Sequence, residues 1–397
     1  MRAQDIPFPS IRTITGLLSL AVALTAPATH AADGTFSAGG YVHYDTRHFH
    51  QGAFDSTSDG SEVRRVRPQF RYTSDTWSAR LMPDLMRDTN QMLDAYVDIT
   101  PPGAWDLRVG RFKTPLSLNR LQSANALAVM ENSVVAAMTP NRDNGVLLGF
   151  DAPGDGDSSW RLEAGVFDGA ADDEVKGSLD GGTEGMLRVL RTQALGSGRL
   201  RFGIGASSGS RHGTQDDPRL ARARTPGRDT WLRYVGSAYS DGEARRTVAF
   251  ADYHGGPWFI QAEAIRSTET VRVDARRERV GRDGWELQAS RVLTGEERKA
   301  DGVQPGNLHV PGLGLPVAVE IGARVAEMHV DGDIFELGFA DPAISGDRMR
   351  SAGVSLALWF PRQWRLQVDY EHSRIRDPAG VRKTSENVLM ARAIMTF

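Results

Sequence analysis

The feature that most constrains the fold is an alternation of apolar and charged residues that returns along most of the chain. The run Trp364–Tyr370 reads WRLQVDY, with an apolar or aromatic side chain at every second position. Similar runs begin at Leu93, Trp105, Trp160, Leu200, Trp258, Val317 and Leu389. Successive side chains of a β-strand point to opposite faces, so each run predicts a strand with one apolar and one charged face.

Such strands fit either a soluble sandwich with its apolar face inward or a membrane barrel with its apolar face outward. Two features favour the barrel: the runs have about nine to eleven residues, as a tilted membrane strand requires, and their polar faces carry full charges, often arginine. Tryptophans also stand at the ends of the apolar stripes, where interfacial girdles lie: Trp105, Trp160, Trp231, Trp258, Trp285 and Trp364.

The segments between the runs are of two kinds. Short turns are expected at Thr73–Asp75, Thr100–Gly103, Leu195–Gly198, His254–Gly256 and Pro361–Gln363. Longer polar segments are expected at Arg47–Glu62, Ala170–Thr183, Gly209–Arg228, Ser267–Arg282, Thr294–Gly314 and Asp331–Arg348. Short turns at one end and long loops at the other are typical of outer-membrane barrels, which have even strand numbers. We therefore predict an all-β fold, a transmembrane antiparallel β-barrel of about sixteen strands.

The first 31 residues are typical of a secretory signal peptide. Arg2 and Arg12 precede an apolar region over Ile14–Ala26, and small residues ending at Ala31 follow it. We predict a signal peptide at 1–31 and one barrel domain at 32–397. The chain has no cysteine, which excludes disulfides and thiolate metal sites.

One long segment does not fit the strand pattern. Between the strand-like runs Trp105–Arg111 and Asn144–Phe150, apolar residues recur at roughly helical spacing, and Pro115 and Pro140 bound the segment. A long structured insertion between two strands is unusual and commonly functional. A sixteen-strand barrel is wide enough for an aqueous channel. We therefore predict that residues 112–143 fold into the lumen as a constriction loop with short helical segments.

The sequence of this segment resembles a known family. GRFKTPLSLNRLQS at Gly110–Ser123 and MENSVVAAMTPNRDNGVLLG at Met130–Gly149 resemble the phosphate-selective porin O and P family of Gram-negative bacteria. The run DAYVDI at Asp94–Ile99 is similar to the same family. The final Thr396-Phe397 resembles the C-terminal aromatic signature that the barrel assembly machinery recognises.

The resemblance implies a trimeric, sixteen-stranded porin in which the third loop folds inward and Arg and Lys line a path for anions. Carried onto the matched positions, Lys113 is the candidate constriction lysine and Asp94 its acidic partner. Arg111, Arg120 and Arg142 also lie within the matched segments. Glu131 and Asp143 are expected to pin the loop to the barrel wall.

A row of arginines gives an independent argument for anion passage. Alternation over Val63–Tyr72 places Arg65, Arg67 and Arg71 on one face, about 7 Å or more apart, with Arg80 and Arg108 on neighbouring polar faces. Arginine binds oxyanions through a two-pronged fork, and rows of Arg and Lys select anions in pores. Two alternatives stay open: the arginines form a wetted face paired with Asp and Glu, and Lys113 forms a loop salt bridge.

These observations predict an outer-membrane porin for passive diffusion of phosphate or other small anions. We expect no cofactor and no enzyme activity, because the catalytic signatures GxSxG, HExxH and the P-loop are missing, and we do not expect His43, His48 and His50 to bind a metal. Expected partners are outer-membrane lipid and lipopolysaccharide, small inorganic anions, the barrel assembly machinery through Phe397 and two further copies, with no nucleic acid. The alternatives are an unselective porin and a soluble exported all-β binding protein or carbohydrate-active enzyme.

Overall fold

A computed structural model describes residues 29–31, 34–53, 58–86, 91–173, 182–221, 223–309, 315–361, 364–378 and 383–397. The predicted signal peptide lies outside the described residues, except for its last three residues. These form β1 (Thr29–Ala31), which pairs with the start of the first barrel strand.

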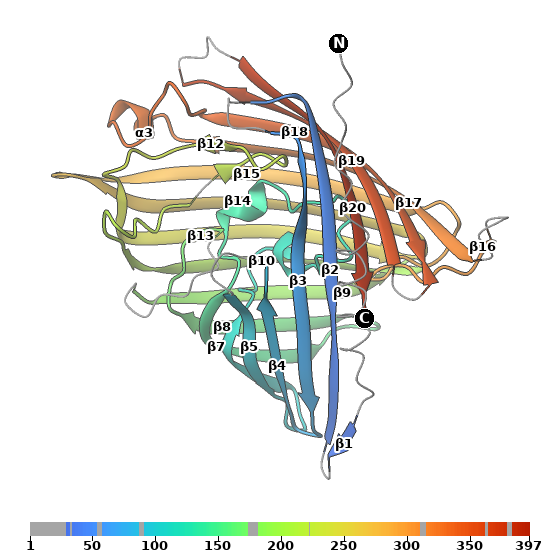
Figure 1. Ribbon diagram of the computed structural model, residues 1–397. Helices are drawn as coiled ribbons and strands as arrows, with labels where there is room; N and C mark the ends of the chain where they lie inside the picture. Colours follow the sequence, from blue (N-terminus) through green and yellow to red (C-terminus); the bar gives the residue numbers. More distant parts are fainter. Residues whose placement is uncertain are drawn as a thin grey trace, which may run out of the picture.

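Sixteen antiparallel strands close into a barrel (Figure 1). They are β2 (Gly34–Gln51), β3 (Gly60–Thr73), β4 (Trp77–Asp84), β5 (Gln91–Ile99), β6 (Trp105–Phe112), β7 (Asp143–Pro153), β8 (Ser159–Phe167), β9 (Glu184–Leu195), β10 (Gly198–His212), β13 (Tyr239–Gly255), β14 (Trp258–Val273), β15 (Arg276–Val292), β17 (Pro316–Val330), β18 (Arg348–Phe360), β19 (Trp364–Arg376) and β20 (Lys383–Thr396). Closure comes from β2, which pairs with β3 on one side and β20 on the other. The predicted fold class and strand number are confirmed.

The short elements lie in the connections. Two strand pairs outside the barrel wall involve β11 (Ala223–Arg224) with β12 (Thr230–Leu232), and β16 (Leu308–His309) with β17. In the part of the chain that the structure describes, the helical elements are single turns: α2 (Leu118–Leu121), η1 (Val135–Met138) and α3 (Asp333–Glu336). No helix among the described residues has the length and apolar character needed to cross a membrane.

The apolar face of the strands points out of the barrel. Outward side chains such as Leu187 and Ile204 are 65% and 62% exposed, whereas the inward residues that alternate with them are largely covered. This orientation excludes the soluble sandwich, which would bury the same face. Trp105, Trp160, Trp258 and Trp364 begin strands at one end of the barrel, as a girdle requires.

The prediction for Trp231 is wrong, because this residue is fully buried. It lies in β12, within the connection from β10 to β13, and packs in the main apolar cluster of the interior. In the sequence, Trp231 stands next to Leu232, and this short apolar pattern resembles the end of a strand. The fold instead turns this segment back toward the barrel interior.

Two of the predicted long loops are also wrong. Most of Ser267–Arg282 belongs to β14 and β15, which are joined by a two-residue turn at Asp274 and Ala275. Thr294–Gly314 does lie between two strands. It follows Val292, however, where β15 reaches the end of the barrel that carries the short turns, so this connection begins at the opposite end from the other long segments. Where the structure describes them, the other predicted long segments lie at the opposite end, which we call the long-loop end. The five predicted short turns lie at the short-turn end, although Arg362 and Gln363 are outside the described residues.

Candidate functional site

The connection from β6 to β7 folds into the barrel, where Figure 1 shows it in teal behind β2 and β3. Its apolar residues Leu118, Val135 and Met138 are buried and belong to one cluster with inward residues of β13, β14, β15 and β17. The approach to β17 is close, because a Cβ at Gly322 would stand 2.7 Å from the carbonyl oxygen of Ala128. The helical pattern of the sequence therefore marks a packed loop face, although only two single turns are helical.

Arginines of the far wall bind the backbone of this loop. Arg365 donates to the carbonyls of Asn125 at 2.9 Å and Leu127 at 2.8 Å, and Arg392 donates to that of Met130 at 2.7 Å. Two more, Arg298 and Arg324, bind the carbonyls of Ala126 and Glu131. Arginine Nε–H and Nη–H groups are donors only, so they satisfy loop carbonyls that have no strand partner. We call Arg298, Arg324, Arg365 and Arg392 the loop-holding arginines.

Carboxylates of the same wall bind the loop amides. The Glu263 carboxylate accepts from the amide of Leu118 at 2.6 Å, and the Asp369 carboxylate accepts from the amide of Met130 at 2.6 Å. Within the loop, the Ser117 hydroxyl caps α2 by accepting from the amide of Arg120 at 3.2 Å. Inward charges on β14, β17, β19 and β20 are therefore largely used to fix the loop.

An open cavity of about 1250 Å³ remains between the loop and the wall formed by β2 to β6. Among the residues that the structure describes, twelve basic and five acidic residues line it. The whole chain, in contrast, carries a net charge of −3. The basic side chains are therefore concentrated at the cavity, and the lining has a positive excess of seven charges.

The middle of the cavity holds several cations that share a few carboxylates. Arg67 binds Asp84 through Nε at 2.9 Å and the Tyr41 hydroxyl through Nη1 at 2.9 Å. Asp94 lies between Arg142, whose Nε donates at 2.9 Å, and Arg80, whose Nε is 3.4 Å away. Each cation is therefore partly neutralised and still faces the cavity.

Among the residues that the structure describes, Lys113 has no salt-bridge partner, in contrast to the alternative considered above; its Nζ donates to the carbonyl of Gln122 at 2.7 Å. Its pKa is lowered well below the ordinary lysine value, first by desolvation and then by the charge of Arg142. Asp94 acts in the opposite direction, without outweighing these effects. Lys113 is thus a cation of the loop that can lose its proton more readily than a lysine in water.

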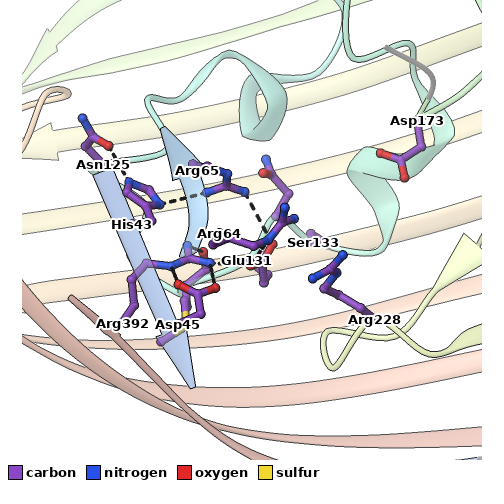
Figure 2. Close-up of polar contacts among 12 residues, drawn as sticks. His43, Asp45, Arg64, Arg65, Asn125, Glu131, Ser133, Asp173, Arg228 and Arg392 are labelled. Atoms are coloured by element: carbon purple, nitrogen blue, oxygen red, sulfur yellow. Dashed lines mark hydrogen bonds and ion pairs between the residues drawn. The ribbon is translucent and has the colours of Figure 1, made fainter. Parts of the chain in front are cut away.

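A second basic group surrounds Glu131 of the loop (Figure 2). Its carboxylate contacts Arg392 at 2.5 Å, but Arg65 and Arg47 are each 3.8 Å away and Arg64 is 4.0 Å away. Burial would raise the pKa of Glu131, and the arginines overcome this and hold it well below the ordinary value. Glu131 pins the loop as expected, and it also occupies the position that a small anion would take among these cations.

Arg64 is a cavity residue that the alternation pattern did not predict. Along β3 the partner of His43 is Arg65 and the partner of Tyr44 is Val63, so Arg64 is an extra residue in the ladder. Such a β-bulge bends the strand and re-aims a side chain. Both Arg64 and Arg65 therefore line the cavity, and no local sequence signal marks this bulge.

His43 connects the barrel wall to the loop. Its Nδ1 is 3.2 Å from Arg65 Nη1, and its Nε2 is 2.8 Å from the side-chain oxygen of Asn125. Because a guanidinium only donates, Nδ1 accepts and the proton resides on Nε2. The histidine is fully buried and is used as a structural link.

Nine of the ten predicted pathway residues line the cavity: Arg65, Arg67, Arg71, Arg80, Asp94, Arg108, Lys113, Arg120 and Arg142. Like Arg67 and Arg142, two more of them have close carboxylate partners, since Arg108 forms a two-pronged pair with Asp98 at 2.6 and 3.0 Å and Arg120 binds Asp173. The side chain of Arg71, near the short-turn end, has neither a hydrogen bond nor an ion pair with any other residue that the structure describes.

Arg111 lies apart from the other nine. Odd-numbered residues of β6, including the exposed Trp105 and Val109, face outward, and Arg111 shares their face. Its guanidinium binds the carbonyl of Met92 at 2.9 Å and the side chain of Asn144 at 3.3 Å. Its inclusion in the anion pathway is therefore corrected, because the strand period turns it away from the lumen.

Cavity residues Arg224 and Arg228 come from the connection between β10 and β13, which sequence reasoning treated as an ordinary loop. The Arg228 Nη1 binds Glu62 at 2.7 Å, and its pKa is lowered to about 10 by burial and by Arg64 and Arg47. Asp301, Val303 and Gln304 of the connection from β15 to β17 also line the cavity. The cavity therefore receives residues from connections at both ends of the barrel.

Comparisons with solved structures identify outer-membrane channels. The outer membrane channel DcaP of Acinetobacter baumannii superposes with a TM-score of 0.58 at 12% identity, covering 93% of this chain and 99% of that chain. OmpT of Vibrio cholerae gives 0.53 at 8% identity over 94% and 100%. An anion-selective porin from Comamonas acidovorans gives 0.51 at 11% identity over 92% and 100%. At these identities the likeness shows the fold alone.

The sequence comparisons give the family. No curated protein matches the chain, but the model of the family described as "Phosphate-selective porin O and P" matches residues 36–397. Together with the barrel, this makes the protein an outer-membrane channel and not an enzyme. The chain belongs to the phosphate-selective porin O and P family.

Proposed function

We propose that this porin conducts small anions, phosphate among them, by passive diffusion along the cavity between the loop and β2 to β6. The observation that carries the proposal is the excess of basic over acidic residues in the cavity lining of a chain that is acidic as a whole. Fixed cations in a pore attract anions and repel cations, which is how anion pores select.

The arrangement of these cations suits transport better than tight binding. Alternate residues of a strand are about 7 Å apart, so Arg65, Arg67 and Arg71 offer an anion successive sites in short steps. Carboxylates such as Asp84 and Asp94 weaken several of the sites. Conduction needs sites that attract an ion without trapping it, and partial neutralisation supplies this balance. No cofactor or energy source enters this mechanism.

The rest of the proposal concerns the protein's setting. We infer that the mature protein is exported with a signal peptide, reaches the outer membrane of a Gram-negative bacterium through the barrel assembly machinery and Phe397, and forms homotrimers. The loop at 112–143 serves as the constriction. The long-loop end faces the cell exterior, as the longer loops of outer-membrane barrels do.

The test is the reversal potential of the purified porin in a planar bilayer under a salt gradient. We expect an anion preference in chloride, and a decrease of chloride conductance when phosphate is added. Arg65→Ala should move the reversal potential toward zero and reduce the anion-to-cation permeability ratio by roughly fivefold, the effect of about 1 kcal/mol. Lys113→Ala should act in the same direction.

The outward-facing Arg111 gives a matched control, since Arg111→Ala removes the same charge outside the cavity. This variant should retain the selectivity of the unchanged protein. A reversal potential near zero for the unchanged protein would identify an unselective porin. An equal effect of Arg65→Ala and Arg111→Ala would show that the cavity arginines do not define the pathway.

A further inference from the structure

A second group of arginines stands on the outer surface of the barrel, at the long-loop end of β18 and β19. The register places Arg348 directly opposite Arg376 and Arg350 directly opposite Arg374. All four arginine side chains lie on the outward face of these strands. The same face carries Val354, Leu356, Val368 and Tyr370, and each of these last four residues is at least 40% exposed. Neighbouring strands are about 5 Å apart and alternate residues about 7 Å apart, so four guanidinium groups arise from one small patch.

Two like charges directly opposite each other destabilise a sheet, so this patch requires nearby negative charge. Within the described residues the protein supplies little. Glu327 serves both Arg350, which it binds closely, and Arg348, 3.6 Å away. Arg376 binds Asp347 at 2.5 Å. The side chains of Arg350 and Arg376 are still 63% and 40% exposed, so they retain donors for another partner.

Arg374 has no carboxylate partner among the residues that the structure describes. Its Nε donates to Nε2 of His372 at 3.0 Å, and Nδ1 of the same ring lies 2.6 Å from the side-chain oxygen of Asn387. Because Nε2 accepts, the ring carries its proton on Nδ1 and is neutral in this arrangement. The positive charge of Arg374 is therefore left without a counterion, at an exposed position on the outer wall.

The height of the patch indicates what supplies the missing charge. On the outward face, the next pair after Arg350 and Arg374 toward the short-turn end is Ala352 and His372. The pair after that, Val354 and Tyr370, begins the apolar belt. A tyrosine at the edge of an apolar belt marks the level of lipid headgroups. Arginine binds phosphate through two parallel hydrogen bonds. We propose that Arg348, Arg350, Arg374 and Arg376 bind the phosphate of a phosphorylated lipid headgroup in the outer leaflet.

This site is separate from the anion pathway, because it lies on the lipid-facing side of the wall. Its ligand continues into acyl chains that cover Val354, Leu356 and Val368, so the same molecule satisfies both the charged and the apolar surface. A free anion would satisfy only the charged part. A second copy of the chain would need a complementary acidic surface at the same height.

The experiment uses the full porin in detergent micelles, with lipid A as the probe. Added lipid A should raise the temperature of the thermal unfolding transition, followed by circular dichroism. A fully dephosphorylated lipid A and inorganic phosphate at the same concentration should leave this temperature unchanged. The apparent lipid affinity should fall roughly fivefold for each arginine removed, in Arg374→Gln and more in Arg350→Gln/Arg374→Gln.

Arg245→Gln is the matched control, because Arg245 is also an exposed outer-wall arginine but is paired with Glu243. It should bind lipid A as the unchanged protein does. The amount of lipid phosphate that co-purifies gives a second measurement, which is independent of stability. Equal lipid binding by Arg374→Gln and the unchanged protein, or an equal shift with inorganic phosphate, would overturn the proposal. Loss of oligomers without loss of lipid would overturn it too, and would assign the patch to contact between copies.

Discussion

The two halves of the barrel interior use the same residue type for different purposes. On the wall of β2 to β6, inward arginines such as Arg65 and Arg80 face an open cavity. On the opposite side, the loop-holding arginines donate to backbone carbonyls of the inserted loop. An inward arginine therefore either faces the cavity alone or also holds the loop, according to whether loop carbonyls lie within reach of its guanidinium. The alternation of side chains along a strand, taken alone, assigns both groups of arginines to the same charged face.

The comparison also explains the position of the cavity. The inward faces of β13, β14, β15 and β17 offer apolar residues such as Val248 and Ile265, against which the apolar side of the loop packs. The wall of β3 offers mainly arginines, which would be costly to bury without partners. The loop therefore packs on the far wall and leaves the arginine-rich wall facing the cavity.

The largest expected effect comes from breaking a loop-holding contact. Arg365→Gln removes two charge-assisted hydrogen bonds to the loop carbonyls of Asn125 and Leu127. We expect it to lower stability by about 3 kcal/mol and to make the single-channel current larger and noisier, as the loop leaves the far wall. Thermal unfolding followed by circular dichroism and single-channel recording measure the two effects.

Arg201→Gln is the control for this variant. Arg201 is also an inward-side arginine in an ion pair, but its partner is Asp252 of the neighbouring strand and not the loop. This change should affect stability without adding current noise. If Arg365→Gln and Arg201→Gln give single-channel currents of the same size and noise, the loop-holding arginines are not what keeps the loop on the far wall.

A smaller effect is expected from Glu131, where the two halves meet. Glu131→Gln removes a carboxylate from among Arg64, Arg65 and Arg47 and leaves Arg392 paired with Asp45 at 2.6 Å. Arg64 and Arg65 then face the cavity without the Glu131 carboxylate as a competitor, so anion conductance should rise by roughly twofold to fivefold. Conductance in dilute potassium chloride measures this, because salt screens the effect.

Asp301→Asn removes one acidic charge from the same cavity lining, away from this arginine group. It should raise anion conductance less than Glu131→Gln does. A fall in conductance for Glu131→Gln, together with reduced heat stability, would instead show that Glu131 acts only by pinning the loop.

The smallest expected effect is a pH dependence that comes from Lys113. Its pKa is lowered by burial and by Arg142, so it is charged at low pH and loses its charge as pH rises through this depressed value, below the ordinary pKa of lysine. Anion selectivity should therefore decrease as pH rises across this range. Lys113→Arg should abolish the decrease, because arginine stays protonated.

Reversal potentials measured at a series of pH values check this expectation. Lys113→Gln should show the lower, high-pH selectivity throughout. A pH dependence that persists unchanged in Lys113→Arg would assign the titration to another group and remove Lys113 from the conducting wall.

The sequence by itself determined the barrel. Alternation in runs such as Trp364–Tyr370 shows which residues share an apolar face, and the strand length and the charged opposite face favour a membrane barrel over a soluble core. The same local rule placed Arg65, Arg67, Arg71 and Arg80 on the lumen side. The same alternation rule also identified the loop, because the apolar residues of the loop do not recur at every second position.

Only the tertiary structure decided which of the inward charges meet water. The bulge at Arg64, the burial of Trp231 and the entry of Arg228 into the cavity depend on contacts between segments distant in the chain. Arg65 and Arg365 look alike in sequence, since each is an arginine at an inward position of a strand. Both side chains line the cavity, but Arg365 donates to the loop carbonyls of Asn125 and Leu127, whereas Arg65 contacts His43 and Glu131. This packing depends on apolar inward residues of strands that neither arginine's local sequence contains.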